Sequence, residues 1–106
     1  IKPAIDYITG NYQDMITLDD LARTSGLSAK YFCKYFRAVT GKTPIDYVNY
    51  YRVDRACFLL EQLKYTVTEV ATECGFNDIS YFIRCFKKYK DCTPYQYAKQ
   101  LKATKE

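Results

Sequence analysis

Hydrophobic residues recur along the chain at the spacing of helices. One face of an N-terminal segment collects Ile1, Ile5, Ile8 and Tyr12. A longer segment repeats the pattern with Ile45, Val48, Arg52, Ala56, Leu59, Leu60 and Leu63. Such spacing gives each helix one apolar stripe. No segment alternates with a period of two over the length of a strand, so the pattern predicts an all-α fold.

Residues typical of helix ends stand between these hydrophobic segments. Four threonines stand three residues before a side chain that can accept a hydrogen bond, the spacing of a helix N-terminus; the pairs are Thr17 with Asp20, Thr43 with Asp46, Thr66 with Glu69 and Thr93 with Gln96. Pro44 and Pro94 fall at the first helical position. Ser28 and either Asn77 or Asp78 can cap two further helices. The expected turns contain Gly26, Gly41 and Gly75.

Together these signals predict seven helices, at about 2–12, 18–25, 29–39, 44–63, 67–74, 79–89 and 94–102. Two pairs of short helices joined by a tight turn predict helix-turn-helix motifs over 17–40 and 66–90. We expect one domain, 1–106, in which subdomains 1–43 and 64–106 are joined by a linker helix, 44–63.

An internal repeat supports this division. Leu21 and Ala22 return as Val70 and Ala71 at an offset of 49. Further along, the offset is 50, with Tyr31, Phe32, Phe36, Pro44 and Tyr47 returning as Tyr81, Phe82, Phe86, Pro94 and Tyr97. One residue is therefore inserted in the second copy, between Gly75 and Tyr81. The repeat predicts two similar active surfaces.

Charge is concentrated in the second helix of each motif. The chain has 106 residues and a net charge of +4. Residues 28–43 contain Lys30, Lys34, Arg37 and Lys42, and residues 79–90 contain Arg84, Lys87, Lys88 and Lys90, with no acidic residue in either segment. The remainder of the chain is mildly acidic. Clustered positive charge suits a polyanion such as nucleic acid.

Composition excludes several other classes of protein. The chain has no His, no Gly-rich phosphate loop, and no Ser or Cys with a plausible base, so we do not expect an enzyme. Its five Cys never form C-x-x-C, which favours reduced cytosolic thiols over a metal site or disulfide framework. We expect no cofactor, no membrane span and no signal peptide. The start at Ile1 leads us to expect a piece of a longer protein.

The expected linker helix has a length that fits two-groove DNA binding. In a helix-turn-helix, the second helix enters the major groove. Twenty helical residues, 44–63, span roughly 30 Å, and one turn of B-DNA is roughly 34 Å. A helical core without a ligand could use the same length.

Over residues 1–100, the chain resembles the C-terminal DNA-binding domain of AraC/XylS-type transcription regulators. The match is distributed along the sequence and includes Gly26-Leu27-Ser28 with Tyr31-Phe32 and Phe36, Thr43-Pro44 with Tyr47, Gly75-Phe76, Asp78, Ser80-Tyr81-Phe82, Arg84, Phe86-Lys87-Lys88, and Thr93-Pro94 with Tyr97. The resemblance implies a seven-helix domain with two helix-turn-helix units. It also implies promoter binding, commonly activation through contact with bacterial RNA polymerase, and a separate sensing or dimerisation domain on the N-terminal side.

The family motif, with the charge pattern, assigns roles to individual residues. By position in the motif, bases in one groove would meet Lys30, Cys33 and Lys34, and bases in the next would meet Ile79, Ser80, Ile83 and Arg84. Arg84 is the best candidate for the two acceptors of guanine. Phosphates suit Arg37, Lys42, Thr43, Lys87 and Lys88, which would fix register rather than sequence.

Two positions depart from the family pattern. The family usually has Arg at Lys34, and lysine cannot make the planar two-pronged contact. It usually has Gly at Asp91, where the turn after helix 79–89 calls for positive φ; Asp tolerates that region better than most residues. These departures leave open a helical protein-interaction module that has lost DNA binding.

The aromatic pairs and Arg52 are expected to be structural. Phe32 with Phe36 and Phe82 with Phe86 are i,i+4 pairs, and we expect them, with Tyr31 and Tyr81, to face the core rather than stack on bases. Arg52 lies on the apolar face of the linker helix, which predicts an ion pair with Asp78.

Overall fold

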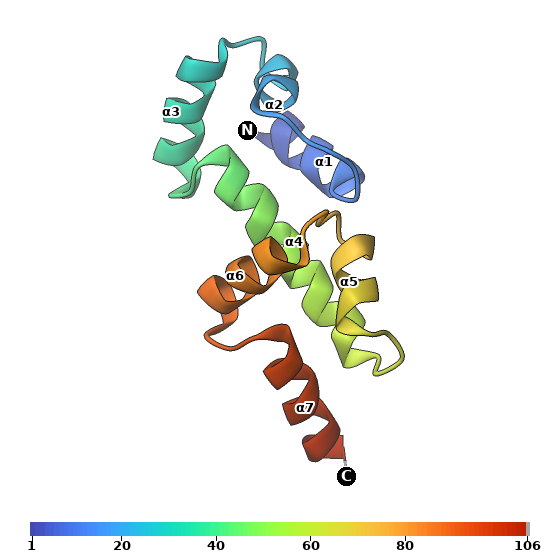
Figure 1. Cartoon of the computed structure of the whole chain (residues 1–106). Coiled ribbons are helices and arrows are strands. Elements are labelled where there is room, and N and C mark those ends of the chain that lie inside the picture. The colour runs from blue at the N-terminus through green and yellow to red at the C-terminus, as the bar shows by residue number, and fades with distance from the viewer. Residues whose placement is uncertain (106) are drawn as a thin grey trace. The chain divides into compact units, whose positions relative to one another are not determined.

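The computed structural model describes residues 1–105, and within them the chain forms seven helices and no strand (Figure 1). The helices are α1 (Lys2–Asn11), α2 (Leu18–Thr24), α3 (Ala29–Thr40), α4 (Pro44–Glu61), α5 (Val67–Glu73), α6 (Ile79–Lys90) and α7 (Pro94–Lys105). The all-α prediction and the number of helices are confirmed. None of these helices is both long and apolar enough to cross a bilayer.

The end of α4 differs from its prediction. The helix stops at Glu61 rather than at residue 63. The N–H groups of Gln62 and Leu63 turn back to the carbonyls of Leu59 and Leu60, at 3.2 and 3.1 Å, and Leu63 takes a left-handed φ of 57°. A leucine rarely adopts that conformation, so no residue type at this point signals the stop.

The contacts within the chain divide it into two units, Ile1–Tyr51 and Arg52–Glu106, and α4 contributes to both. Of the stripe that the sequence predicted on α4, Val48, Ala56 and Leu60 are buried. Val53 and Cys57 are buried as well, whereas Ile45 is 40% exposed. Most of the predicted stripe is therefore confirmed; Val53 and Cys57 also belong to the buried face, and Ile45 does not.

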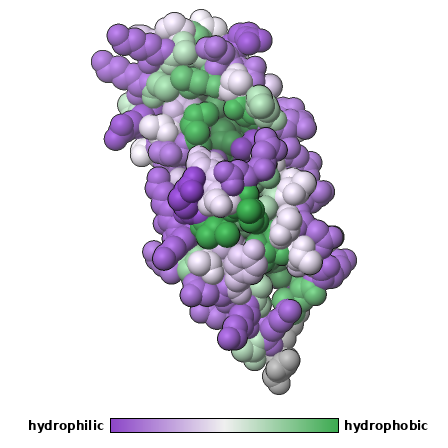
Figure 2. Space-filling view, viewed as in Figure 1, coloured by the Kyte–Doolittle hydropathy of each residue, from purple (hydrophilic) through white to green (hydrophobic). Residues whose placement is uncertain are grey.

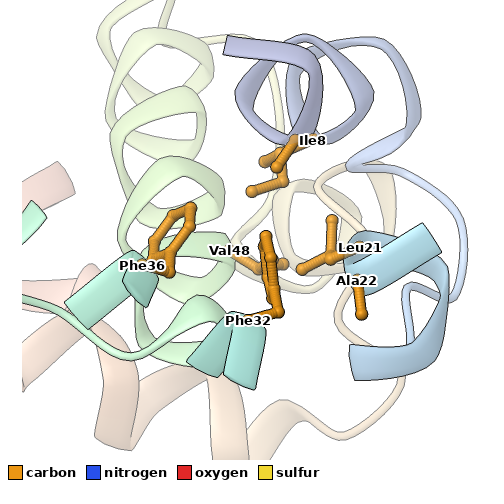
Figure 3. Close-up of a cluster of buried hydrophobic side chains, with 7 residues drawn as sticks. Ile8, Leu21, Ala22, Phe32, Phe36 and Val48 are labelled. Carbon is orange, nitrogen blue, oxygen red and sulfur yellow. The ribbon is translucent and has the colours of Figure 1, made fainter. Parts of the chain in front are cut away.

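The core of the first unit joins four helices. Phe32 and Phe36 of α3 lie against Leu21 of α2, Ile8 of α1 and Val48 of α4 (Figure 3). Ile8, Leu21, Phe32 and Phe36 have no exposed surface. Burying an apolar side chain of this size contributes roughly 1.5–3 kcal/mol. The basic helix α3 is therefore anchored by the face that carries its two phenylalanines.

The core of the second unit repeats this arrangement. Phe82 and Phe86 of α6 are fully buried, as is Val70 of α5. Phe86 meets Tyr97 edge to face with ring centroids 5.5 Å apart, and Phe36 meets Tyr47 in the same way at the same distance. The four phenylalanines thus face the cores as predicted.

Several large hydrophobic side chains lie on the surface of the chain. Figure 2 shows hydrophilic residues over much of the visible face, with apolar patches between them. The large hydrophobic side chains with the greatest exposure are Met15, Tyr31, Val39, Phe58 and Tyr95. Their exposure means that part of the aromatic content is available for contacts outside the cores.

Candidate nucleic-acid interface

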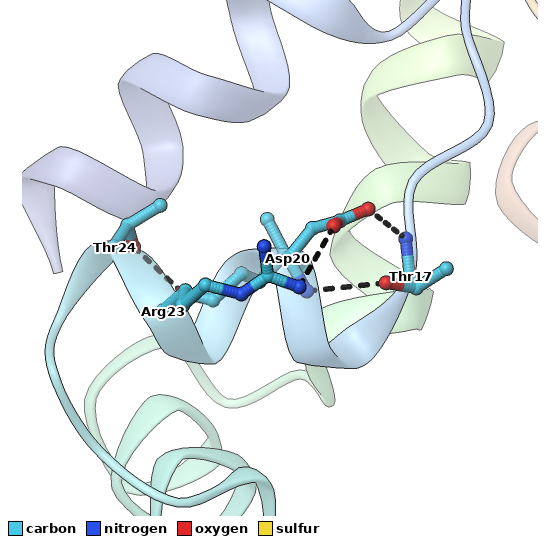
Figure 4. A network of polar contacts seen from close by, with 5 residues as sticks. Thr17, Asp20, Arg23 and Thr24 are labelled. Carbon is cyan, nitrogen blue, oxygen red and sulfur yellow. Dashed lines mark hydrogen bonds and ion pairs between the residues drawn. The ribbon is translucent and has the colours of Figure 1, made fainter.

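The first helix-turn-helix begins at a fixed helix terminus. The Thr17 hydroxyl accepts from the Asp20 N–H at 3.1 Å, and the Asp20 carboxylate accepts from the Thr17 N–H at 3.0 Å (Figure 4). These hydrogen bonds lower the pKa of Asp20 below its ordinary value. Arg23 adds an ion pair to Asp20 at 3.6 Å. This capping box confirms the prediction from the Thr17 and Asp20 spacing.

The turn that follows sets where α3 begins. The N–H groups of Ser25 and Leu27 both reach the carbonyl of Ala22, at 3.1 and 3.3 Å, and Gly26 between them takes a φ of 66°. The Ser28 side chain then accepts from the N–H of Tyr31 at 3.4 Å, which caps α3 as predicted.

The face of α3 away from the core is basic. Lys30, Lys34 and Arg37 are exposed, and within residues 1–105 none of the three takes part in an ion pair. Cys33 is half-buried. The three cations are therefore available to an external anion, while the thiol is only partly accessible.

The next two predicted phosphate residues have intramolecular partners. The Thr43 hydroxyl accepts from the Asp46 N–H at 3.2 Å and so caps α4. The Lys42 ammonium lies 4.9 Å from the centre of the Tyr50 ring. Both residues are half-buried. Their positions at the start of α4 are fixed, and less of each side chain is free than the sequence suggested.

The second helix-turn-helix is built in the same way. Thr66 and Glu69 form a capping box, with the Glu69 carboxylate accepting from the Thr66 N–H at 2.8 Å and the Thr66 hydroxyl accepting from the Glu69 N–H at 3.1 Å. These bonds lower the pKa of Glu69. Asp78, rather than Asn77, caps α6 and accepts from the N–H of Ser80 at 2.9 Å. The extra residue of the second copy lies in the turn between α5 and α6.

The outward face of α6 mixes cations with apolar surface. Ser80, Arg84, Lys87 and Lys88 are exposed. The Arg84 guanidinium lies over the ring of Tyr81, 5.6 Å from its centre. Aromatic contact of this kind limits the freedom of a guanidinium and leaves its N–H groups available.

Four of the predicted exposures are wrong in detail. Ile79 and Ile83 are half-buried rather than fully outward. Tyr31 and Tyr81, expected in the cores, are 63% and 39% exposed. Each tyrosine precedes a buried phenylalanine by one residue, so the helical rotation of about 100° turns it away from the core. That signal was present in the sequence.

The sequence prediction missed an aromatic and apolar stripe on α3. Tyr31, Tyr35 and Val39 are spaced by four residues and are 63%, 44% and 57% exposed. Their i,i+4 spacing, one turn apart, was the signal that could have revealed them.

The comparisons with known proteins agree with this geometry. The model of a helix-turn-helix domain family matches residues 21–100. The YdeC protein of Bacillus subtilis, an uncharacterised helix-turn-helix-type transcriptional regulator, is 38% identical over 99 residues, 93% of this chain and 34% of that protein. A probable AraC family transcriptional regulator from Rhodopseudomonas palustris superposes with a TM-score of 0.85 at 25% identity, over 95% of each chain. The chain belongs to the AraC-type helix-turn-helix family.

A structure with DNA is among the AraC-type domains that this chain resembles. The DNA-binding domain of AdpA, a global transcriptional factor, was solved in complex with a target DNA, and it matches with a TM-score of 0.86 and 26% identity over 96% of this chain and 95% of that one. The present chain thus has the AraC-type helix-turn-helix fold, which occurs in the DNA-binding domains of transcriptional regulators. It spans about a third of the length of YdeC.

Asp91, a departure from the AraC-type pattern, adopts the same turn conformation as Gly41 in the first unit. Its φ is 61°, and its N–H donates to the carbonyl of Lys87 at 2.9 Å. Gly41 makes the matching bond to Arg37 at 2.9 Å with a φ of 78°. The positive φ expected at this turn is therefore present with aspartate in place of glycine.

Two basic residues have structural surroundings. The Arg52 guanidinium lies 5.8 Å from the centre of the Phe76 ring, and burial lowers the pKa of Arg52. Its ion pair with Asp78 stays a prediction. Lys90 lies 4.0 Å from the Asp54 carboxylate, which offsets one of the positive charges counted on α6.

Proposed function

We propose that α3 and α6 enter successive major grooves of a promoter duplex and read its sequence. The observation that supports this most strongly is the basic outward face that recurs on α3 and α6 at an offset of 50 residues, each opposite a fully buried pair of phenylalanines. A solvated charged surface needs no such repetition on the second helix of both motifs. α4 is 18 residues long, about 27 Å of helix, comparable with the roughly 34 Å of one DNA turn.

In this proposal the base contacts divide between the two helices. Residues proposed for base edges are Lys30, Cys33 and Lys34 on α3, and Ile79, Ser80, Ile83 and Arg84 on α6. Arg84 suits the O6 and N7 acceptors of guanine, and the accessible parts of the two isoleucines suit thymine methyl groups. The half-burial of Ile79 and Ile83 supports a fixed apolar surface rather than mobile side chains.

The phosphate contacts would set position and affinity. The proposed residues are Arg37, Lys42, Thr43, Lys87 and Lys88. Arg37 and Lys87 are exposed at the C-terminal ends of α3 and α6, in matching places of the repeat. Such contacts hold the helix in register and make binding depend on salt.

We further propose that the chain acts within a longer cytoplasmic regulator, as an activator that contacts RNA polymerase and carries an N-terminal sensing or dimerisation domain. The support is the length of the relatives, since the chain covers 34% of YdeC and 40% of HptR, a transcriptional regulatory protein of Staphylococcus aureus. The activating role follows the family resemblance alone.

The test is selection from a randomised duplex library, followed by a salt titration on the best sequence. The proposal predicts two short motifs about one helical turn apart and a log–log salt slope of roughly −4 to −7 for about five to eight neutralised phosphates. Salt-dependent binding without an enriched motif would contradict the proposal that the two helices recognise a specific base sequence. Absence of binding at low salt would favour the protein-interaction module.

A further inference from the structure

A groove of about 540 Å³ opens in the second unit, where α7 passes the end of α4 and the start of α5. Its floor is apolar. Leu60 and Val67 there are 3% and 8% exposed, and Leu63 and Ala98 are half-buried. The volume lies within the range of roughly 300–1,000 Å³ that is common for ligand sites.

The rim of this groove is basic. Lys64, Lys99 and Lys102 line it and are exposed, and none of the described residues that line it is acidic. Tyr65 and Tyr95 complete the rim, 41% and 53% exposed, and each brings a phenol hydroxyl. Lysines near the ends of α7 and α4 complement the dipoles of these helices, and here they come from two separate segments to the same rim.

Two of the residues that line this groove are not repeated in the first unit. At the position that matches Ala98 it has Val48, a larger side chain that is 2% exposed. At the position that matches Lys64 it has Met15. The repeat therefore does not conserve the small residue of the floor or the lysine beside it, and their combination belongs to the second unit.

The groove is also separate from the proposed DNA surface. Neither α3 nor α6 contributes a residue to it. A phosphate backbone would meet the lysines and leave the floor of Leu60, Leu63 and Val67 without contact. A neutral apolar ligand would have no use for the three cations. A ligand that matches both features has apolar side chains on one face and carboxylates beside them.

We propose that this groove docks an acidic amphipathic helix of a partner protein. The apolar face of that helix would lie on Leu60, Leu63 and Val67, and its carboxylates would meet Lys64, Lys99 and Lys102. Recognition of an amphipathic helix by an apolar groove is a common mode of peptide binding. The lysines, being exposed, would favour the acidic partner in encounter and orientation more than in affinity.

The test uses a short fluorescein-labelled helical peptide with leucines along one face and glutamates on the other. We expect saturable binding to the chain by fluorescence anisotropy. A peptide with serines in place of the leucines should not bind. The double variant Lys64→Glu/Lys99→Glu should weaken the leucine peptide by about tenfold, since each reversed pair is exposed and individually weak.

The matched control is Lys30→Glu/Lys34→Glu, which reverses the same number of lysines on α3. This variant should lose affinity for duplex DNA and retain its affinity for the peptide. Lys64→Glu/Lys99→Glu should retain its affinity for DNA and lose affinity for the peptide. Ala98→Leu, which fills the floor without a change of charge, should also weaken the peptide; thermal unfolding checks that each variant folds.

Three results would overturn the proposal. They are no binding of the leucine peptide, equal binding of the serine peptide, and a loss of DNA affinity with unchanged peptide affinity in Lys64→Glu/Lys99→Glu. The last would assign these lysines to DNA. If the unaltered chain does not bind DNA, the proposed function fails, but the peptide experiment still tests the groove on its own.

Discussion

On α6 of the second unit, Arg84 lies 5.6 Å over the ring of Tyr81, and Tyr81 in turn contacts Phe76 with ring centroids 6.2 Å apart. The matching positions of the first unit hold Lys34, Tyr31 and Leu27. With no aromatic side chain at position 27, Tyr31 remains 63% exposed, against 39% for Tyr81.

The two units share the residues of their cores but differ in the residues that face outward. Fully buried phenylalanines and the tyrosines that meet them recur at an offset of 50, because they fix the second helix of each motif. The outward positions diverge. An oriented guanidinium presents a rigid planar fork to the two acceptors of guanine, whereas the ammonium of a flexible lysine has no fixed fork and adapts to several partners. We therefore expect stricter sequence reading by α6 and a larger share of non-specific affinity from α3.

The largest effects are expected in the shared cores. Phe36→Ala and Phe86→Ala should each lower the free energy of unfolding by about 3–5 kcal/mol, because each leaves a cavity in a closely packed core. Urea unfolding measures both. Phe58→Ala, at a side chain 49% exposed, is the control and should change stability by about 0.5 kcal/mol or less. If only one of the two variants lost little free energy of unfolding, the two cores would not be equivalent.

The next effect sharpens the contrast between the recognition helices. Arg84→Ala should weaken binding to the selected duplex by about 1–3 kcal/mol, since it removes a base contact. Lys34→Ala should cost about 1 kcal/mol or less, because the lysine gives one adaptable contact. Fluorescence anisotropy measures both, with Lys2→Ala as a control at an exposed lysine of α1. A larger loss for Lys34→Ala would reverse the assignment.

A smaller effect concerns the matching turns after α3 and α6. Asp91 adopts a φ of 61° and Gly41 a φ of 78°. Asp91→Gly should stabilise the second unit by up to about 1 kcal/mol, and Gly41→Asp should destabilise the first by a similar amount. A Cβ added at Gly41 would meet no atom within 4 Å, so the backbone alone sets the cost. Thermal unfolding measures the direction of both stability changes. If both variants change stability in the same direction, the explanation by positive φ is refuted.

The smallest effect tests the two capping boxes. Hydrogen bonds from Thr17 and Thr66 lower the pKa values of Asp20 and Glu69 below the ordinary 3.8 and 4.5. The folded state therefore favours the carboxylates. Their contribution is complete above those ordinary values and is lost as the pH falls through the lowered ones. In the double variant Asp20→Asn/Glu69→Gln, the unfolding temperature should depend less steeply on pH in this acid range than in the wild type. An unchanged slope of unfolding temperature against pH would contradict the prediction.

Much of the fold could be predicted because its signals are local. Capping threonines, prolines at the first helical position and turn glycines act within a few residues, and most of these signals recur in the second copy, with Asp91 in place of Gly41 as the exception. The buried face of α4 was predicted only in part, since Val53 and Cys57 are buried as well as Val48, Ala56 and Leu60. The end of α4 at Glu61 was not predicted, because the positive φ of Leu63 that follows it is not signalled by a residue type.

The candidate site was predictable in outline only. The exposed cations of α3 and α6 follow from helical spacing opposite the phenylalanines. The support of Arg84 by Tyr81, the partial burial of Lys42 against Tyr50, and the pairing of Lys90 with Asp54 depend on side-chain packing. Charge counted along the sequence does not reveal these contacts, so it overstates the number of free cations.

The most direct test of the account is a library selection repeated with the wild type, Arg84→Lys and Lys34→Arg. We predict that the wild type enriches one strict and one degenerate motif about one helical turn apart, that Arg84→Lys relaxes the strict motif, and that Lys34→Arg sharpens the degenerate one. Equal stringency of the two wild-type motifs, or loss of the strict motif on changing Lys34 rather than Arg84, would contradict the central claim that α6 is the stricter reader.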